Sequence, residues 1–372
     1  MYDQKIQEDL FYIMLYGAVA MMSLMASCYL LLRRANAIAP DVTSSVRLRR
    51  WTAAFFACMT LSHLWYLPVA FHTSSVEILQ SYLVGAMLDF MTLIPCAIVL
   101  LLVLLQDRRR PLWPVGVMVA PVILGLAVSL VYNHYDILPQ FYGYHLLLAI
   151  GLIIYMVRAT RQYGHWLRDN YADLEHKEVW QSLAVLAIIL LVFGIYAFGI
   201  KNMIYKYITQ VNNIILICYL LWRVETLSDL SIPVDDAEEE TGATEHEEDN
   251  ALSLSMRNNV GPLLKVHCEE PQLYLQQDLT LFRLAKEIGI NRLYLTQYFS
   301  SQGMNYNAYI NDLRINHFIS LYHEAVAAHR PVIAQQLAFE SGYQSYNTFR
   351  GAFKRKTGQS VTAWMETQRM KD

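Results

Sequence analysis

Long apolar runs, separated by short polar loops, fill most of the first 222 residues of the chain. A helix of roughly 20 apolar residues is long enough to cross the hydrocarbon core of a bilayer, and each run has about that length. We count seven of them: Leu10 to Leu32, Trp51 to Phe71, Tyr82 to Leu105, Leu112 to Tyr132, Leu138 to Val157, Val179 to Ile200 and Met203 to Trp222. The last is the weakest, because Lys206, Gln210 and Asn212 interrupt it. The pattern predicts a seven-helix transmembrane domain over residues 1–222.

Basic residues occur in alternate loops. Lys and Arg are retained preferentially on the cytoplasmic side of short loops. The connections after the first, third and fifth runs hold them: Arg33, Arg34, Arg47, Arg49, Arg50, Arg108, Arg109, Arg110, Arg158, Arg161, Arg168 and Lys177. The loops at 72–80 and 133–137 contain no Lys or Arg. This alternation predicts an N-terminus outside the cell and a cytoplasmic chain after Trp222.

The first run is preceded by an acidic leader and is too long for the apolar core of a cleaved signal peptide, so we expect it to remain as a membrane helix. None of the loops that we predict to face outward exceeds roughly a dozen residues, which leaves no room for a separate extracellular sensor domain. Any signal is therefore expected to be read within or close to the bilayer.

Residues 223–257 lose the apolar periodicity and are expected to form a linker. Between Asp235 and Asp249 the chain holds nine acidic residues and no Lys or Arg. Such a run repels itself and is expected to be a disordered, solvated tether. The alternative is that these acids compete with DNA phosphates for a basic face of the domain that follows.

An internal repeat follows the linker. Leu284–Ile290 and Leu337–Tyr343 share the pattern Leu-Ala-x-Glu-x-Gly at an offset of 53 residues. In each copy a short amphipathic helix is expected to end at the glycine, and a cap residue (Asn291, or Gln344–Ser345) then opens a second helix. Apolar anchors at helical spacing follow: Leu295 and Phe299 in the first copy, Phe349 and Phe353 in the second. A single copy could be an ordinary helical hairpin, but two matching copies favour helix-turn-helix units, whose second helix enters the major groove.

These residues resemble the AraC-type regulators, in particular the variety common in Bacteroidetes. The resemblance covers Leu279 to Trp364, with a first unit that reads "LTLFRLAKEIGINRLYLTQYFSSQGMNYNAYINDLRI" and a second that reads "VIAQQLAFESGYQSYNTFRGAFKRKTGQS". Two positions depart from the pattern: Val361 stands where the family usually has proline, and Phe318 where a small residue is usual. Both departures concern packing more than DNA contact. The resemblance implies an all-helical DNA-binding domain over residues 258–372.

The resemblance also implies which residues meet DNA, on recognition helices that begin near Asn291 and Ser345. The first helix offers Leu293, Thr296 and Gln297 to bases, and Arg292 to phosphate. The second offers Tyr346, Asn347 and Arg350, whose amide and guanidinium groups suit adenine and guanine edges. Three further basic residues are expected to contact the DNA backbone: Lys354, Arg355 and Lys356. Between Ala251 and Asp372 the chain has 13 Lys and Arg against 9 Asp and Glu, a modest excess of about +4 that suits a basic face but not tight non-specific binding.

Composition and motifs exclude other classes of protein. The chain is 55% hydrophobic and 16% charged, as expected when much of it lies in lipid. Its five cysteines are scattered and are interpreted as small core residues rather than as a disulfide framework or a zinc site. We find no phosphate-binding glycine loop, zinc-protease helix, nucleophile elbow or phospho-accepting receiver pattern. The sequence therefore predicts neither an enzyme nor a bound cofactor or metal.

Asp89 is the unusual ionisable residue of the membrane half, since an ionised carboxylate in hydrocarbon costs at least a few kcal/mol. It either makes a structural hydrogen bond within the bundle or belongs to a polar sensing pocket. The other candidate sensing residues are His63, His145, Lys206 and Asn212. For the two histidines, a structural hydrogen bond is favoured over metal binding.

Together these features predict an all-α protein of the bacterial inner membrane: a seven-helix bundle joined to a cytoplasmic domain with two helix-turn-helix units. Its function would be sequence-specific transcription regulation coupled to a signal sensed in or at the membrane. The expected partners are double-stranded DNA, the lipid bilayer, a small-molecule or membrane signal, and a second copy in a homodimer. The alternative is a membrane receptor or transporter-like protein whose helical tail recruits protein partners.

Overall fold

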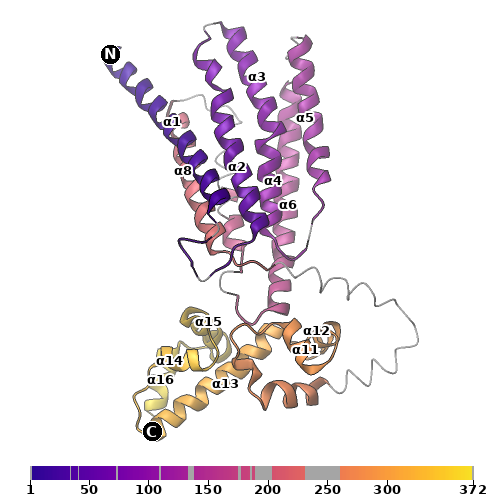
Figure 1. Ribbon diagram of the computed structural model, residues 1–372, viewed down its shortest axis with the longest axis vertical. Coiled ribbons are helices and arrows are strands. Elements are labelled where there is room, and N and C mark those ends of the chain that lie inside the picture. Colours follow the sequence, from indigo (N-terminus) through magenta and orange to yellow (C-terminus); the bar gives the residue numbers. More distant parts are fainter. Residues whose placement is uncertain are drawn as a thin grey trace, which may run out of the picture. The chain divides into compact units, whose positions relative to one another are not determined.

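The computed structural model describes residues 2–33, 35–40, 42–72, 74–108, 110–132, 138–174, 177–184, 187–188, 203–230 and 260–370. All regular secondary structure in these ranges is helical (Figure 1), and the only pairing of extended backbone among them is an isolated bridge between Tyr171 and Thr280. The predicted all-α fold class is confirmed. The chain divides into two compact units, one of residues 1–163 and 179–231 and the other of residues 164–178 and 232–372.

The first unit is a bundle of long helices that lie side by side in Figure 1. Its helices are α1 (Tyr2–Leu32), α2 (Val46–Trp65), the short 3-10 helix η1 (Leu67–Ala70), α3 (Ser75–Met91), α4 (Leu93–Leu104), α5 (Trp113–Tyr132), α6 (Leu138–Asn170) and α8 (Met203–Thr226). Helix α1 packs against α2 and α8, α2 packs against α4, and α3 packs against α5. The end of α6, from residue 164 onward, belongs to the second unit together with residues 171–178.

Five helical segments among the described residues are long and apolar enough to cross a membrane. They are Leu10–Leu32, Val46–Val69, Ser75–Leu104, Trp113–Tyr132 and Leu146–Asn170. These correspond to the first five runs predicted from the sequence. Most of the predicted sixth run lies outside the described residues. The predicted seventh run is helical, within α8, but is not among the five; the polar residues Gln210, Asn212 and Asn213 are buried there.

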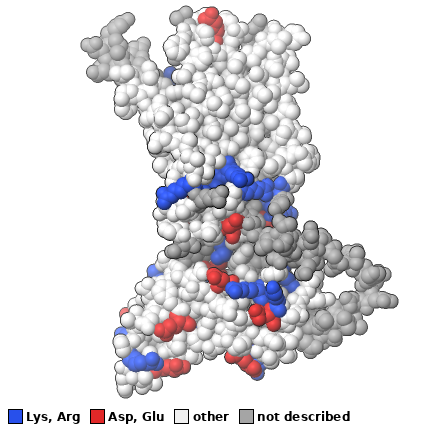
Figure 2. All heavy atoms as spheres, viewed as in Figure 1, with Lys and Arg blue, Asp and Glu red and all other residues white. Residues whose placement is uncertain are grey.

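On the face that Figure 2 shows, most charged side chains of the first unit lie toward its ends. Most of the described surface between those ends is uncharged, and Lys and Arg gather toward one end. Many large apolar side chains on these helices are exposed, including Leu10, Met25, Val117 and Leu147. An apolar exterior with charge restricted to the rims is the surface that a bilayer requires.

The third apolar run, predicted as a single helix, is interrupted at Thr92. Its backbone (φ −127°, ψ −68°) leaves helical geometry between α3 and α4. Pro95 explains the break, because proline has no amide hydrogen to donate to the carbonyl four residues before it. Asp89 lies in the last turn of α3, directly before this break.

The end of α8 is fixed by buried polar contacts within the first unit. The Glu225 carboxylate accepts hydrogen bonds from the backbone amides of Ala37 and Ile38 at 3.0 and 2.8 Å and from the Tyr29 hydroxyl. The Ser44 hydroxyl donates to the Val224 carbonyl at 2.6 Å. Helix α8 therefore extends to Thr226, so the first residues of the predicted linker are helical; residues 231–257 of that linker lie outside the described residues.

The five cysteines are free thiols. Only Cys268 is buried, in the core of the second unit, whereas Cys58 and Cys96 are half-buried with their sulfurs 3.7 Å apart. Cys28 and Cys218 are exposed on α1 and α8, so their interpretation as core residues is wrong. The length of an apolar run does not tell which side of the helix packs on its neighbours.

The second unit is built from short helices around one long helix. They are the π-helical turn η3 (Lys265–Glu269), the 3-10 turn η4 (Leu273–Leu275), α11 (Leu281–Ile288), α12 (Arg292–Ser301), α13 (Tyr306–Ala327), α14 (Ala334–Glu340), α15 (Tyr346–Thr357) and α16 (Val361–Arg369). Helix α13 contributes to two hydrophobic clusters. Its first half packs Tyr306 and Ile310 with α11 and α12, and its second half packs Phe318 and Tyr322 with α14, α15 and α16.

Candidate nucleic-acid interface

Both copies of the repeat fold into the same helix-turn-helix. Gly289 and Gly342 adopt left-handed backbone conformations, with φ of 75° and 85°, after α11 and α14. The Asn291 side chain then accepts from the Leu293 amide at 2.8 Å, and the Ser345 hydroxyl accepts from the Asn347 amide at 3.2 Å. Each bond satisfies an amide in the first turn of the next helix. The predicted starts of the two recognition helices, α12 and α15, are therefore confirmed.

Apolar anchors fix one face of each recognition helix. Leu295 and Phe299 of α12 and Phe349 and Phe353 of α15 are all buried, as their spacing predicts. Because residues three and four apart share a helical face, burial of these anchors turns the remaining positions toward solvent. The geometry of the anchors thus decides which side chains can reach a ligand.

On α12 the outer face carries the residues that the family resemblance implies. Leu293 is 59% exposed and Gln297 is exposed, while Arg292 and Thr296 are half-buried. The Thr296 hydroxyl donates to the Arg292 carbonyl at 3.1 Å, within the helix. This face combines an apolar side chain, an amide and a hydroxyl, a set that can contact a thymine methyl group and base edges.

On α15 the exposed residues form a polar and basic stripe. Asn347, Arg350 and Lys354 are exposed and follow one another at three and four residues, so they lie on one face. Arg355 is exposed beside them. Tyr346 differs, because it is half-buried and its ring lies 5.8 Å from that of Phe349. The stripe therefore exposes one amide and several cations, groups of the kind that base edges and phosphates bind.

Lys356 has a partner within the protein. Its ammonium lies 3.2 Å from the Asp312 carboxylate and donates to the Asp312 carbonyl at 2.9 Å and the Asn316 side chain at 3.0 Å. These bonds tie the end of α15 to α13. A contact between Lys356 and phosphate would have to compete with them. Lys354 and Arg355 have no such side-chain bond among the described residues. The sequence does not reveal this pairing, because Asp312 lies 44 residues away.

Arg314, which the family resemblance places in the long helix between the two helix-turn-helix units, has contacts that the sequence does not reveal. It is 1% exposed, and its guanidinium donates to the carbonyls of Tyr274 and Gln276, both at 2.7 Å. It also lies over the Tyr343 ring at 5.5 Å. Burial lowers the pKa of Arg314 and raises the pKa of the Tyr343 hydroxyl well above its ordinary value, so at neutral pH a cation faces a neutral ring.

The two departures from the family pattern are packing positions. Val361 is the first residue of α16, after the N-cap Ser360, and is buried. Proline suits that position because its missing amide hydrogen would be unpaired there anyway, and valine supplies apolar bulk instead. Phe318 lies at the centre of the second cluster, 4.5 Å from the Phe349 ring and 5.6 Å from the Phe353 ring. Neither position lies on the outer stripe.

The candidate sensing residues of the first compact unit bond to different partners. His63 is buried, and its ring nitrogens lie 2.8 Å from the Met59 carbonyl and 3.2 Å from the Gln210 side chain. The Trp65 indole donates to Asp89 at 3.1 Å. The exposed Lys206 lies over the Tyr12 ring at 5.6 Å.

Asn212 is buried and its amide nitrogen has no hydrogen-bond partner among the described residues. The His145 side chain lies outside the described residues. The described contacts therefore link His63 with Gln210 of α8 and Asp89 with Trp65 at the end of α2. They do not bring the candidate sensing side chains together in one cluster.

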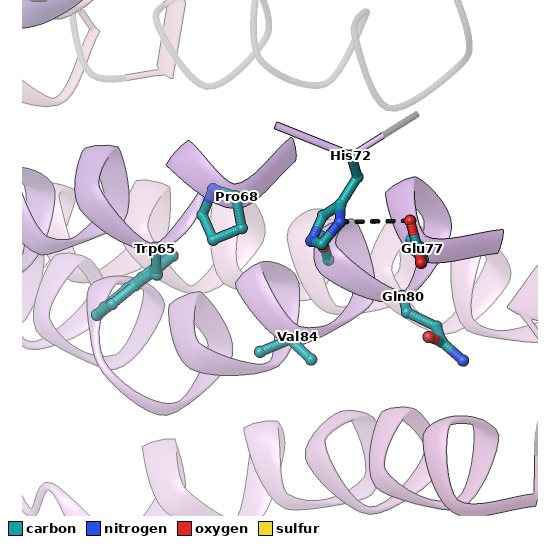
Figure 3. A pocket seen from close by; sticks show the side chains of 7 residues that line it. Trp65, Pro68, His72, Glu77, Gln80 and Val84 are labelled. Carbon is teal, nitrogen blue, oxygen red and sulfur yellow. Dashed lines mark ion pairs between the residues drawn. The ribbon is translucent and has the colours of Figure 1, made fainter. Parts of the chain in front are cut away.

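A small open pocket lies beside Trp65. Helices α2, η1 and α3 and the loop between η1 and α3 line it, with Trp65, Pro68, His72, Glu77, Gln80, Ser81 and Val84. Figure 3 shows the His72 imidazole directed at the Glu77 carboxylate, 3.5 Å away, on one side of the pocket and Trp65 on the other. Trp65 thus lines this pocket and also bonds Asp89.

Comparison with protein families matches residues 284–367 to the model described as a helix-turn-helix domain. The match begins in α11 and ends in α16, so it includes both turns and both recognition helices. Comparison with curated proteins and with solved structures gives no match.

Proposed function

We propose that this chain, which carries an AraC-type helix-turn-helix domain at residues 284–367, is a membrane-anchored, sequence-specific DNA-binding transcription regulator. Its parts are a membrane domain over 1–222, an acidic linker over 223–257 and a DNA-binding domain over 258–372. The AraC-type family consists of DNA-binding regulators and is not an enzyme class. The observation that carries the proposal is the pair of capped recognition helices whose outer faces remain exposed.

Chromatin immunoprecipitation of the full-length protein tests this function. A regulator should recover a small set of promoters that share a sequence motif, whereas a tail that recruits proteins should show no sequence preference. Half-sites spaced by whole helical turns in the recovered DNA would also support the proposed homodimer, because a dimer places its recognition helices on one face of the duplex. A random set of fragments would contradict the proposal.

The exposed stripe of α15 predicts which substitutions relax specificity. Arg350→Ala and Asn347→Ala should each weaken specific binding by about 1–3 kcal/mol, with the loss confined to a few adjacent base pairs, because each removes contacts to base edges. Lys354→Ala should weaken binding to all sequences alike and reduce the salt dependence, because it removes a phosphate contact.

The measurement is fluorescence anisotropy of labelled DNA with full-length protein in lipid nanodiscs, on the recovered site and on single-base variants. Equal behaviour of all three variants would contradict this placement of α15 on DNA.

The proposed localisation is the inner membrane of a bacterium, with an outside N-terminus and a cytoplasmic DNA-binding domain. Apolar helices and the basic loops between them support this orientation. A phosphatase that is active only in the periplasm should be inactive when fused after Trp222 and active when fused within residues 133–137. Activity of the first fusion and inactivity of the second would reverse the orientation.

We further propose that the membrane domain reads a signal and that Asp89 takes part. The pocket beside Trp65 is open, and Trp65 connects it to Asp89, so a ligand there would act on that hydrogen bond. Asp89→Asn keeps the shape and removes the charge, and is expected to fix transcription of the target genes in one state at unchanged protein abundance. Target transcripts and membrane-fraction protein are measured in the same cells, and a normal response at normal abundance would remove Asp89 from signalling.

A further inference from the structure

The segment Tyr171–Asp173, directly after α6, is part of the core of the DNA-binding unit. Ala172 is 1% exposed and belongs to the hydrophobic cluster formed by α11, α12 and the start of α13. Tyr171 forms the isolated β-bridge with Thr280, the N-cap residue of α11. A segment from the loop between two predicted membrane helices thus completes a core whose other members lie between Val260 and Ile310.

Two buried asparagines of α13 bind the backbone of this segment. The Asn307 amide nitrogen donates to the Ala172 carbonyl at 2.6 Å and to the Tyr171 carbonyl at 3.1 Å. The Asn311 amide nitrogen donates to the Ala172 carbonyl at 3.2 Å and to the Asn307 carbonyl at 2.8 Å. Asparagine is rarely buried without such partners, because an unsatisfied amide inside a protein costs about 1–3 kcal/mol. Removing the segment would leave the Asn307 donors without these acceptors.

The same segment reaches the second helix-turn-helix unit. Asp173 is 5% exposed, and its carboxylate accepts from the Thr348 hydroxyl of α15 at 3.4 Å. Thr348 lies next to Asn347, one of the residues proposed to read bases. Three consecutive residues therefore contact the N-cap of α11, the first half of α13 and the recognition helix α15. Helices α11 and α13 in turn pack against the other recognition helix, α12.

We propose that Tyr171–Asp173 is a strap by which the membrane region holds the DNA-binding unit, independently of the acidic linker. The strap is covalently continuous with α6 on one side and packed into both helix-turn-helix units on the other. The two recognition helices must fit successive stretches of the major groove. Because the strap bonds to both helix-turn-helix units, a movement of the membrane helices could change the distance between the two recognition helices. This consequence for DNA rests on the proposed function, whereas the docking itself does not.

The test cuts the linker and asks whether the domain leaves. A site for a sequence-specific protease is inserted within residues 235–249 of the full-length protein, which is then reconstituted in lipid vesicles and cleaved. We expect most of the cleaved C-terminal fragment to sediment with the vesicles, held by the strap. An excess of a synthetic peptide of residues 164–178 should displace it into the supernatant. The matched control is the same peptide with Ala172→Glu, which should not displace it, because a carboxylate cannot enter the apolar site of Ala172 without a large desolvation cost.

Immediate release of the fragment after cleavage would overturn the proposal. Displacement by both peptides, or by neither, would overturn it as well, because retention would then be unspecific. No variant of the protein other than the inserted site is used, so misfolding of a mutant cannot produce the expected result. This experiment does not measure DNA binding, so it tests the strap separately from the proposed function. If a separate measurement showed that the retained fragment does not bind DNA, the proposed function would be contradicted but the strap would not.

Discussion

Replacing Arg314 with methionine is expected to destabilise the DNA-binding unit by about 3–5 kcal/mol, because it removes two hydrogen bonds from a charged donor, one to the buried Tyr274 carbonyl and one to the part-buried Gln276 carbonyl. The guanidinium donates to Tyr274 and Gln276 and lies over the Tyr343 ring, and methionine can replace the bulk but none of these bonds. Urea-dependent proteolysis of the full-length protein in detergent micelles measures the change, read on the C-terminal fragment.

Lys356→Met is the matched control, since it also removes a cation that bonds to a backbone carbonyl of the same unit. The Lys356 ion pair with Asp312 is exposed, so its loss should cost no more than about 1 kcal/mol. Similar losses for the two variants would mean that burial of Arg314 does not increase the contribution of its hydrogen bonds to stability.

The local features of the DNA-binding unit were predictable from the sequence, because they depend on residues a few positions apart. The glycines after α11 and α14, the caps Asn291 and Ser345, and the buried anchors all follow from helical spacing and from the chemistry of helix ends. The exposure of Asn347 and Arg350 follows in turn from burial of Phe349 and Phe353.

Contacts between distant segments were not predictable in this way. Arg314 resembles any other arginine of an amphipathic helix until the carbonyls of Tyr274 and Gln276, about 40 residues earlier, are placed beside it. Asn307 and Ala172 are separated by 135 residues, and Ala172 lies in a segment that the sequence assigns to a cytoplasmic loop. Periodicity reports which face of a helix is buried but not which part of the chain covers it.

In the bundle of long helices, too, local features were predictable and contacts between distant segments were not. Apolar run length predicted the first five helices, since it reflects the thickness of the bilayer. The break at Thr92 depends on the single residue Pro95, which a count of apolar positions treats as neutral. The hydrogen-bond partners of Asp89 and His63 depend on how helices pack, so the sequence could identify these residues as unusual without saying which neighbours satisfy them.

Gly342→Ala is expected to destabilise the DNA-binding unit by about 2–4 kcal/mol, from a left-handed backbone and from overpacking, which act independently. Gly342 has φ of 85°, where any residue with a side chain is strained. An added Cβ would also lie 2.6 Å from the Leu275 carbonyl oxygen and 2.8 Å from the Leu275 Cα. Both atoms belong to the backbone of η4, so no side chain can rotate to relieve the contact. The turn between α14 and α15 must therefore move away from η4.

Gly289→Ala separates the two causes, because Gly289 occupies the equivalent turn, between α11 and α12, of the first helix-turn-helix. Its φ of 75° is similar, but an added Cβ would meet nothing within 4 Å. It should therefore lose only the conformational part, about 1 kcal/mol. Both variants are measured in the full-length protein by the same urea-dependent proteolysis. If Gly342→Ala loses no more stability than Gly289→Ala, η4 moves without an energetic cost. The close contact between η4 and the turn after α14 would then not contribute to stability.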